Sequence, residues 1–226
     1  MLRNSTPCKV IAVTTASSTP VARGRRGVRP SGDDRELAIL ETAKRLFENR
    51  SIAEVSVDDL ARGAGLSRPT FYFYFASKDA VLVALFKRAI HEADIAFGEH
   101  TQTPPPADRY EMCRSGISVF FDTFARHRGV TRAAHEVRAS HPEVRELLVK
   151  FMDKWIDATT AMIESWRAQG LAPTTLPARD LATALYLMNE RALFASFADE
   201  QPSIAREKLL DTLTHIWVTS IYGEAR

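Results

Sequence analysis

The residues after Pro30 form a succession of segments with helical hydrophobic spacing, separated by glycines and prolines. No segment offers the flanking turns and a partner that a β-strand requires. The chain is therefore predicted to be all-α, with about nine helices. We expect these helices over residues 33–49, 57–64, 68–75, 78–103, 108–126, 128–139, 142–169, 179–198 and 203–222.

Residues with helix-capping chemistry stand at the starts of two of these segments. Asp33 and Glu36 have capping-box spacing at the start of the first helix. Its inward face is predicted from four apolar residues at helical spacing: Leu37, Leu40, Ala43 and Phe47. Ser56 is the expected N-cap of the second helix, with Asp59 three residues later and Gly65 just after the helix ends.

Residues 71–75 read FYFYF, which alternates like a strand when taken alone. Ser67 is a suitable N-cap, and Pro69 is tolerated in a first helical turn, so we expect a helix. At 100° per residue, Phe71 and Phe75 then point inward, whereas Phe73 points outward with Pro69. The run is therefore predicted to divide between core and surface.

Two short helices joined by a tight turn, with a longer helix before them, are typical of a helix-turn-helix. The second short helix of such a unit enters the major groove of DNA, where an outward phenylalanine can contact thymine methyl groups. Hydroxyl and cationic groups nearby can contact phosphates and base edges. The predicted DNA contacts here are Arg68, Pro69, Thr70, Tyr72, Phe73, Tyr74 and Lys78. The alternative is a tightly packed helical hairpin with tyrosines at its rim.

Positive charge is concentrated at the start of the chain. The chain carries a net charge of +2, but residues 1–32 alone hold six basic and no acidic side chains. This stretch is rich in Ser, Thr, Pro and Gly, so we expect a disordered arm. Arg25 and Arg26 are predicted to contact DNA phosphates. The alternative is an arm that only aids solubility or remains from cloning.

Several other function classes have little support. No apolar run approaches the roughly 20 residues of a membrane helix, and the first residues do not resemble a signal peptide, so a cytoplasmic protein without a membrane partner is expected. The two cysteines and six histidines lack ligand spacing, so no metal or other cofactor is predicted. No nucleophile motif is present, so an enzyme is not expected. A helical enzyme or a protein-interaction module is the alternative, which sequence-dependent binding to duplex DNA would separate from a regulator.

The stretch SVDDLARGAGLSRPTFYFYFASKDAVL, residues 56–82, resembles the DNA-binding signature of TetR-family transcriptional repressors, and the wider resemblance covers residues 23–226. It implies a homodimer that binds double-stranded operator DNA and is released by a hydrophobic small-molecule effector. It also implies control of a monooxygenase gene. The expected domains are a basic arm (1–32), a helix-turn-helix domain (33–78) and a ligand-binding and dimerisation domain (79–226).

The segment from Leu181 to Phe197 is apolar on more than one face, so it must be buried on several sides. Dimerisation explains that pattern, and burial inside a monomeric helical bundle explains it too. The resemblance implies the first, because the last two long helices of the family pair with those of a second copy.

The middle helices carry two apolar stripes rich in rings, one from Ile117 to Phe124 and one from Leu148 to Thr159. Stripes of this kind more often form a core, but the resemblance implies a long apolar ligand channel. Cys113 and Ala158 replace larger residues and should widen it, whereas Tyr186 should fill part of it. The implied lining is Cys113, Gly116, Ile117, Phe120, Phe124, Leu148, Met152, Trp155, Thr159, Tyr186, Asn189, Phe194 and Trp217. Asn189 is the expected polar anchor.

Overall fold

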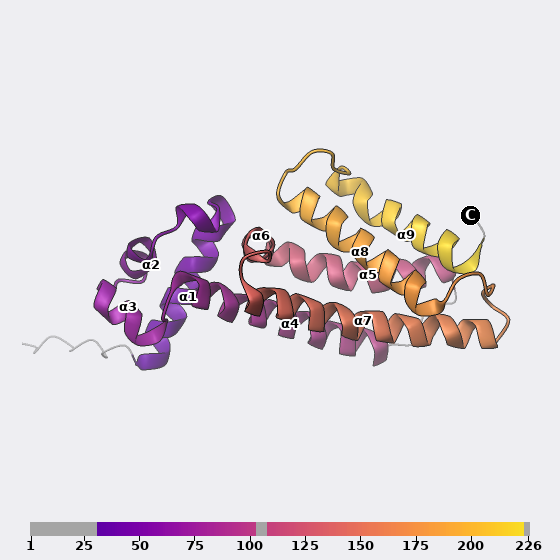
Figure 1. Ribbon diagram of the computed structural model, residues 1–226, viewed down its shortest axis with the longest axis horizontal. Helices are drawn as coiled ribbons and strands as arrows, with labels where there is room; N and C mark the ends of the chain where they lie inside the picture. Colours follow the sequence, from indigo (N-terminus) through magenta and orange to yellow (C-terminus); the bar gives the residue numbers. More distant parts are fainter. Residues whose placement is uncertain (1–30, 103–107, 224–226) are drawn as a thin grey trace, which may run out of the picture. The chain divides into compact units, whose positions relative to one another are not determined.

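The computed structural model describes residues 31–102 and 108–223, so Arg25, Arg26 and nearly all of the expected basic arm lie outside the described residues. Within these ranges the chain forms nine α-helices, one short 3-10 helix and no strand (Figure 1). This confirms the all-α prediction. None of the described helices combines the length and the hydropathy needed to cross a membrane.

The first helices form what we call the head: α1 (Gly32–Asn49), the 3-10 helix η1 (Ile52–Glu54), α2 (Val57–Gly63) and α3 (Arg68–Tyr74). The body consists of α4 (Lys78–Gln102), α5 (Arg109–Arg126), α6 (Arg128–Val137), α7 (Pro142–Ala168), α8 (Ala178–Phe197) and α9 (Arg206–Tyr222). Helix α4 packs against α5 and α7, α7 packs against α8, and α5 packs against α9 (Figure 1). Each expected helix is present, and η1 was not predicted.

The cap of α1 differs from the prediction. Ser31, not Asp33, is the N-cap: its Oγ accepts a hydrogen bond from Asp34 N at 3.1 Å, and the Asp34 carboxylate accepts one from Ser31 N at 2.8 Å. The hydrogen bond from the Ser31 backbone N–H also lowers the pKa of the Asp34 carboxyl. The capping box therefore begins two residues earlier than Asp33 and Glu36 indicated.

The inward face of α1 also differs in part. Leu40, Ala43 and Phe47 are fully buried as predicted, but Leu37 is 47% exposed, and Ile39 is buried in its place. The buried arc is centred on the side of Ile39 and Ala43, and Leu37 lies roughly 140° from that centre. Its inclusion in the core was wrong.

The turn between α2 and α3 follows from its residues. Gly65 has φ +69°, a conformation that costs glycine least, and it ends α2 as a Schellman motif. In that motif Leu66 N donates to Ala61 O at 2.9 Å and Gly65 N to Arg62 O at 3.1 Å. Ser67 then caps α3, accepting a hydrogen bond from Thr70 N at 3.3 Å. The N-cap Ser67 of α3 and the end of α2 at Gly65 were both predicted correctly.

Helix α6 of the body contacts the end of α1. The last carbonyls of a helix have no partner within it, and the last turn of α1 holds no basic residue of its own. Arg132 of α6 supplies the cation: its Nη2 donates to Phe47 O at 2.7 Å and to Arg50 O at 2.9 Å. A Cβ on Gly129 would lie only 2.6 Å from Phe47 C, so this approach needs glycine. Helix α6 is thus closely fitted to the head.

Candidate functional site

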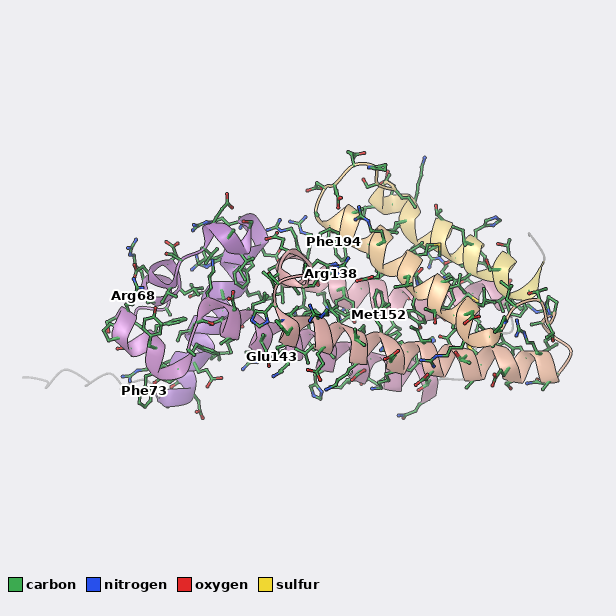
Figure 2. All side chains as sticks on the ribbon, in the orientation of Figure 1. Arg68, Phe73, Arg138, Glu143, Met152 and Phe194 are labelled. Carbon is green, nitrogen blue, oxygen red and sulfur yellow. The ribbon has the colours of Figure 1, made fainter. Side chains whose placement is uncertain are left out.

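Helix α3 divides its aromatic residues between core and solvent as its periodicity predicted. Phe71 is fully buried and Phe75 nearly so. Phe73, which Figure 2 labels on α3, is 84% exposed. The predicted helical phase is confirmed. A phenylalanine so exposed buries almost no apolar surface within the chain, so its ring is available to a partner.

Arg68 and Tyr72 form a small polar group on the exposed side of α3. Arg68 Nη1 lies 3.2 Å from Asp58 Oδ2 of α2, and Arg68 Nη2 donates to the Tyr72 hydroxyl at 3.3 Å. Half of the Arg68 side chain is exposed, and exposed ion pairs contribute little to stability. The guanidinium can therefore exchange Asp58 for another anion at small cost.

Other predicted DNA contacts are more constrained. Lys78 was expected to offer a free charge, but its Nζ donates to Ile52 O at 2.6 Å and Val55 O at 3.0 Å. These carbonyls lie in and just after η1, so the ammonium holds this turn against the start of α4. The Thr70 hydroxyl lies 2.8 Å from Ser67 Oγ within the α3 cap. Tyr74 is half-buried, and Pro69 is exposed.

The body contains a cavity of about 480 Å³, partly open to solvent, between α4, α5, α7, α8 and α9. Such a volume suits a small organic molecule. Nine of the thirteen residues that the resemblance implied line this cavity: Cys113, Gly116, Ile117, Phe120, Trp155, Thr159, Tyr186, Asn189 and Trp217. The structure therefore brings most of the implied residues together in one place.

The remaining four residues, Phe124, Leu148, Met152 and Phe194, surround a second cavity of only about 20 Å³. Met152 and Phe194 lie on α7 and α8 (Figure 2). The expected single channel is therefore divided into two spaces. The reason is that Phe120 stands between them, packed against the ring of Tyr186 with centroids 6.4 Å apart.

Sequence reasoning missed seven residues that line the larger cavity: Phe97, His100, Thr101, Met112, Ser115, Met162 and Trp166. For two of them a signal existed, since Met162 and Trp166 continue the stripe of Trp155 and Thr159 at helical spacing. His100 and Thr101 gave no such signal, because polar residues near a helix end usually face solvent.

Polar groups are few in the larger cavity, and their hydrogen bonds define what is left for a ligand. Trp217 Nε1 can only donate, and it donates to Asn189 Oδ1 at 3.1 Å. This fixes the orientation of the buried Asn189 amide, and its NH2 group has no partner among the described residues. The hydroxyls of Thr159 and Tyr186 are 3.1 Å apart and satisfy each other. Asn189 thus offers a donor within an apolar wall.

Cys113 contributes an apolar surface, not a reactive group. Burial raises the pKa of its thiol to about 12, so the sulfur stays protonated at neutral pH. Within residues 31–102 and 108–223, no group of three or more His, Cys, Asp and Glu side chains is arranged to hold a metal ion. The larger cavity therefore has the chemistry of a binding site for an apolar molecule.

Comparisons with known proteins agree with this arrangement. The family described as "Bacterial regulatory proteins, tetR family" matches residues 39–85, and "Transcriptional regulator EthR, C-terminal domain" matches residues 113–223. The HTH-type transcriptional regulator EthR of Mycobacterium tuberculosis is 58% identical over 216 residues, which cover 96% of this chain and 100% of that protein. EthR of Mycolicibacterium smegmatis is 55% identical over 211 residues, covering 93% and 97%.

Solved structures show the same fold. A transcriptional regulator from Saccharomonospora viridis, in complex with choline, has a TM-score of 0.66 at 20% identity and covers 81% of this chain and 95% of that one. A TetR regulator from Haloarcula marismortui has a TM-score of 0.66 at 13% identity, covering 86% and 100%. The 58% identity to EthR extends over nearly the whole chain, so it shows the family as well as the fold. The chain belongs to the TetR family of transcriptional regulators, in its EthR group, and these regulators are not enzymes.

Proposed function

We propose that this regulator is a repressor that binds operator DNA as a homodimer and leaves it when a hydrophobic small molecule occupies the larger cavity. The observation that carries the proposal is this cavity of about 480 Å³, walled by aromatic rings and holding the Asn189 amide donor. Two helices of the body, α4 and α6, pack against α1 of the head. A change at the cavity can therefore reach the helix-turn-helix through packed elements.

The proposed DNA interface is the exposed side of α3. Phe73 would contact apolar base edges, and Arg68 and Tyr72 would contact phosphates or bases. The residues from 33 to 78 carry seven basic and eight acidic side chains, so this segment alone provides no net attraction to DNA. The six basic residues before it would supply that attraction, with Arg25 and Arg26 on the phosphates.

The proposed dimer interface is the outer side of α8 and α9. Leu187 of α8 is 54% exposed, and Met188 and Ala192 of α8 and Ile216 of α9 are only partly buried. A two-fold dimer would place two copies of α3 at half-sites about one helical turn, roughly 34–36 Å, apart. Leu187→Glu should yield monomers in sedimentation, whereas Val149→Glu, equally exposed on α7, should not.

The proposed function is tested by footprinting the protein on DNA upstream of its own gene and the neighbouring genes. The sequence resemblance adds the expectation that one of these encodes a monooxygenase. Operator affinity is then titrated against hydrophobic esters, amides and ketones, and it should fall about 5–150-fold with at least one ligand that occupies the cavity. Deleting residues 1–29 should flatten the salt dependence of binding, by about 0.9 in log–log slope per lost phosphate contact. If every ligand that fills the cavity left operator binding unchanged, effector release would be contradicted.

A further inference from the structure

Phe120 separates the larger cavity from the small one. Among the described residues it alone lines both spaces. Its ring is nearly inaccessible to solvent, and four other rings surround it. The centroids of Trp155 and Tyr186 lie 5.7 and 6.4 Å from it, and those of Phe124 and Phe151 lie 4.8 and 5.9 Å away. Phe120 is therefore a partition of one side chain within an aromatic cluster.

The partition is braced from the side of the larger cavity. The Tyr186 ring packs edge-on against Phe120, and its hydroxyl is held 3.1 Å from Thr159 Oγ1. The small cavity has a volume of about 20 Å³, close to that of a single water-sized probe. A phenyl ring displaced into that space must push the residues on its far side.

Those residues include α6, the helix fitted to the head. Thr131 and His135 of α6 line the small cavity. Arg132, adjacent to Thr131, donates to the last carbonyls of α1, and Glu136 accepts a hydrogen bond from Ile52 N at 3.2 Å. Gly129 leaves no clearance between α6 and α1. Because cores and such interfaces are close-packed, a push on α6 is passed to the head and not absorbed between them.

We infer that Phe120 determines which ligands are effectors, an inference that rests on the proposed function. A compact ligand fits the larger cavity, leaves the ring in place and has the same affinity for the free and the operator-bound protein. An extended, unbranched apolar molecule reaches the partition, turns Phe120 toward the small cavity and moves α6 against the head. Since a ligand shifts an equilibrium only through its difference in affinity for two states, only the second kind releases DNA. Occupancy and release are thereby separated by ligand length.

The test uses straight-chain methyl ketones of increasing length with the full-length protein. Calorimetry measures occupancy, and fluorescence anisotropy measures operator affinity at saturating ketone. Below a threshold length, operator affinity should change by less than about twofold despite full occupancy; above it, affinity should fall about 5–150-fold. Phe120→Ala should move the threshold to longer chains. Phe97→Leu alters a ring that lines only the larger cavity, so it should weaken binding at every length and leave the threshold in place.

Release that follows occupancy equally at all lengths would overturn the inference, as would the same threshold in wild type and Phe120→Ala. The wild-type series alone decides the matter if Phe120→Ala does not fold. A different outcome would contradict the proposed function itself. If bound ketones of every length leave operator affinity unchanged, effector release by ketones is wrong, and the inference about Phe120 falls with it.

Discussion

The head and the body both bury aromatic side chains, but with different results. In the head, Phe47 and Phe71 are fully buried in the hydrophobic core. In the body, Phe120 and Trp155 are almost as inaccessible, yet they form the wall of a cavity of about 480 Å³. Low exposure therefore does not distinguish a filled core from the lining of a binding site. The two cases differ in whether atoms or empty space lie on the far side of the ring. Substitutions can measure that difference through the free energy of unfolding.

The largest expected effect is in the filled core of the head. Phe71→Ala should lower the free energy of unfolding by about 3–5 kcal/mol, because it removes a buried ring and leaves a cavity. Phe73→Ala, two residues later, removes the same atoms from a solvent-exposed position and should change stability by less than about 0.5 kcal/mol. It should nevertheless cost roughly 1–3 kcal/mol of specific operator binding.

Denaturant unfolding and operator titration of both variants provide the measurement. If Phe73→Ala destabilised the fold as much as Phe71→Ala, the division of α3 into a core side and a DNA side would be wrong.

Substitutions by a larger side chain should distinguish the filled core of the head from the cavity of the body more directly than substitutions by a smaller one. Ala43 is fully buried in α1, so Ala43→Leu overfills a packed core and should cost about 1–3 kcal/mol of stability. Ala158 lines the larger cavity, where Ala158→Leu has room for its new methyl groups. Its free energy of unfolding should stay constant or rise by about 1 kcal/mol.

Urea unfolding of the two variants tests this contrast, and ligand binding to Ala158→Leu should be weaker because the cavity is smaller. Equal destabilisation by both substitutions would mean that the body around Ala158 is as filled as the head.

The same contrast explains how far the sequence predicted the molecule. Ser67 and the orientation of Phe71 follow from interactions within a few residues along the chain, so caps and periodicity identified them. Leu37 and Lys78 depend on distant partners. For Leu37 the reason is the burial of α1 on its other side. For Lys78 it is the carbonyls of Ile52 and Val55, near a turn that was not predicted although Ser51 and Glu54 have capping-box spacing. The cavity depends on the distance between α5, α7 and α8. A ring-rich stripe has the same spacing whether atoms or empty space lie opposite, and the resemblance, not the periodicity, indicated the site.

Acid should weaken the body selectively. Burial, with the charges of Arg138 and Arg191, lowers the pKa of His135 from 6.5 to about 4. The unfolded chain then takes up the proton first, so this stability is complete above about pH 6.5 and is lost as the pH falls toward 4. The loss should reach at most about 1.4 kcal/mol per pH unit. Glu190, whose pKa is raised by burial, offsets part of it.

His135→Phe keeps a ring stacked on Phe194, whose centroid lies 4.5 Å away, and removes the titrating group. The free energy of unfolding should therefore depend less on pH in the variant than in wild type between pH 6.5 and 4. Residues 31–77 of the head contain no histidine, so this effect belongs to the body. Identical pH profiles of the two proteins would show that His135 is not held neutral.

The smallest expected effect concerns the Asn189 amide donor in the larger cavity. Trp217 engages the Asn189 oxygen, so the NH2 group remains for a ligand carbonyl. Wild type should bind a straight-chain ketone more tightly than the alkane of the same length by about 0.5–1.5 kcal/mol, the net contribution of one hydrogen bond. Asn189→Leu should abolish or reverse this preference. The substitution also leaves Trp217 Nε1 without its acceptor, but that cost is common to both ligands and cancels in their difference.

Calorimetry of the two ligands with both proteins gives the comparison. An unchanged preference in Asn189→Leu would place the ligand's polar group elsewhere, and His100, which also lines the cavity, would be the next residue to substitute.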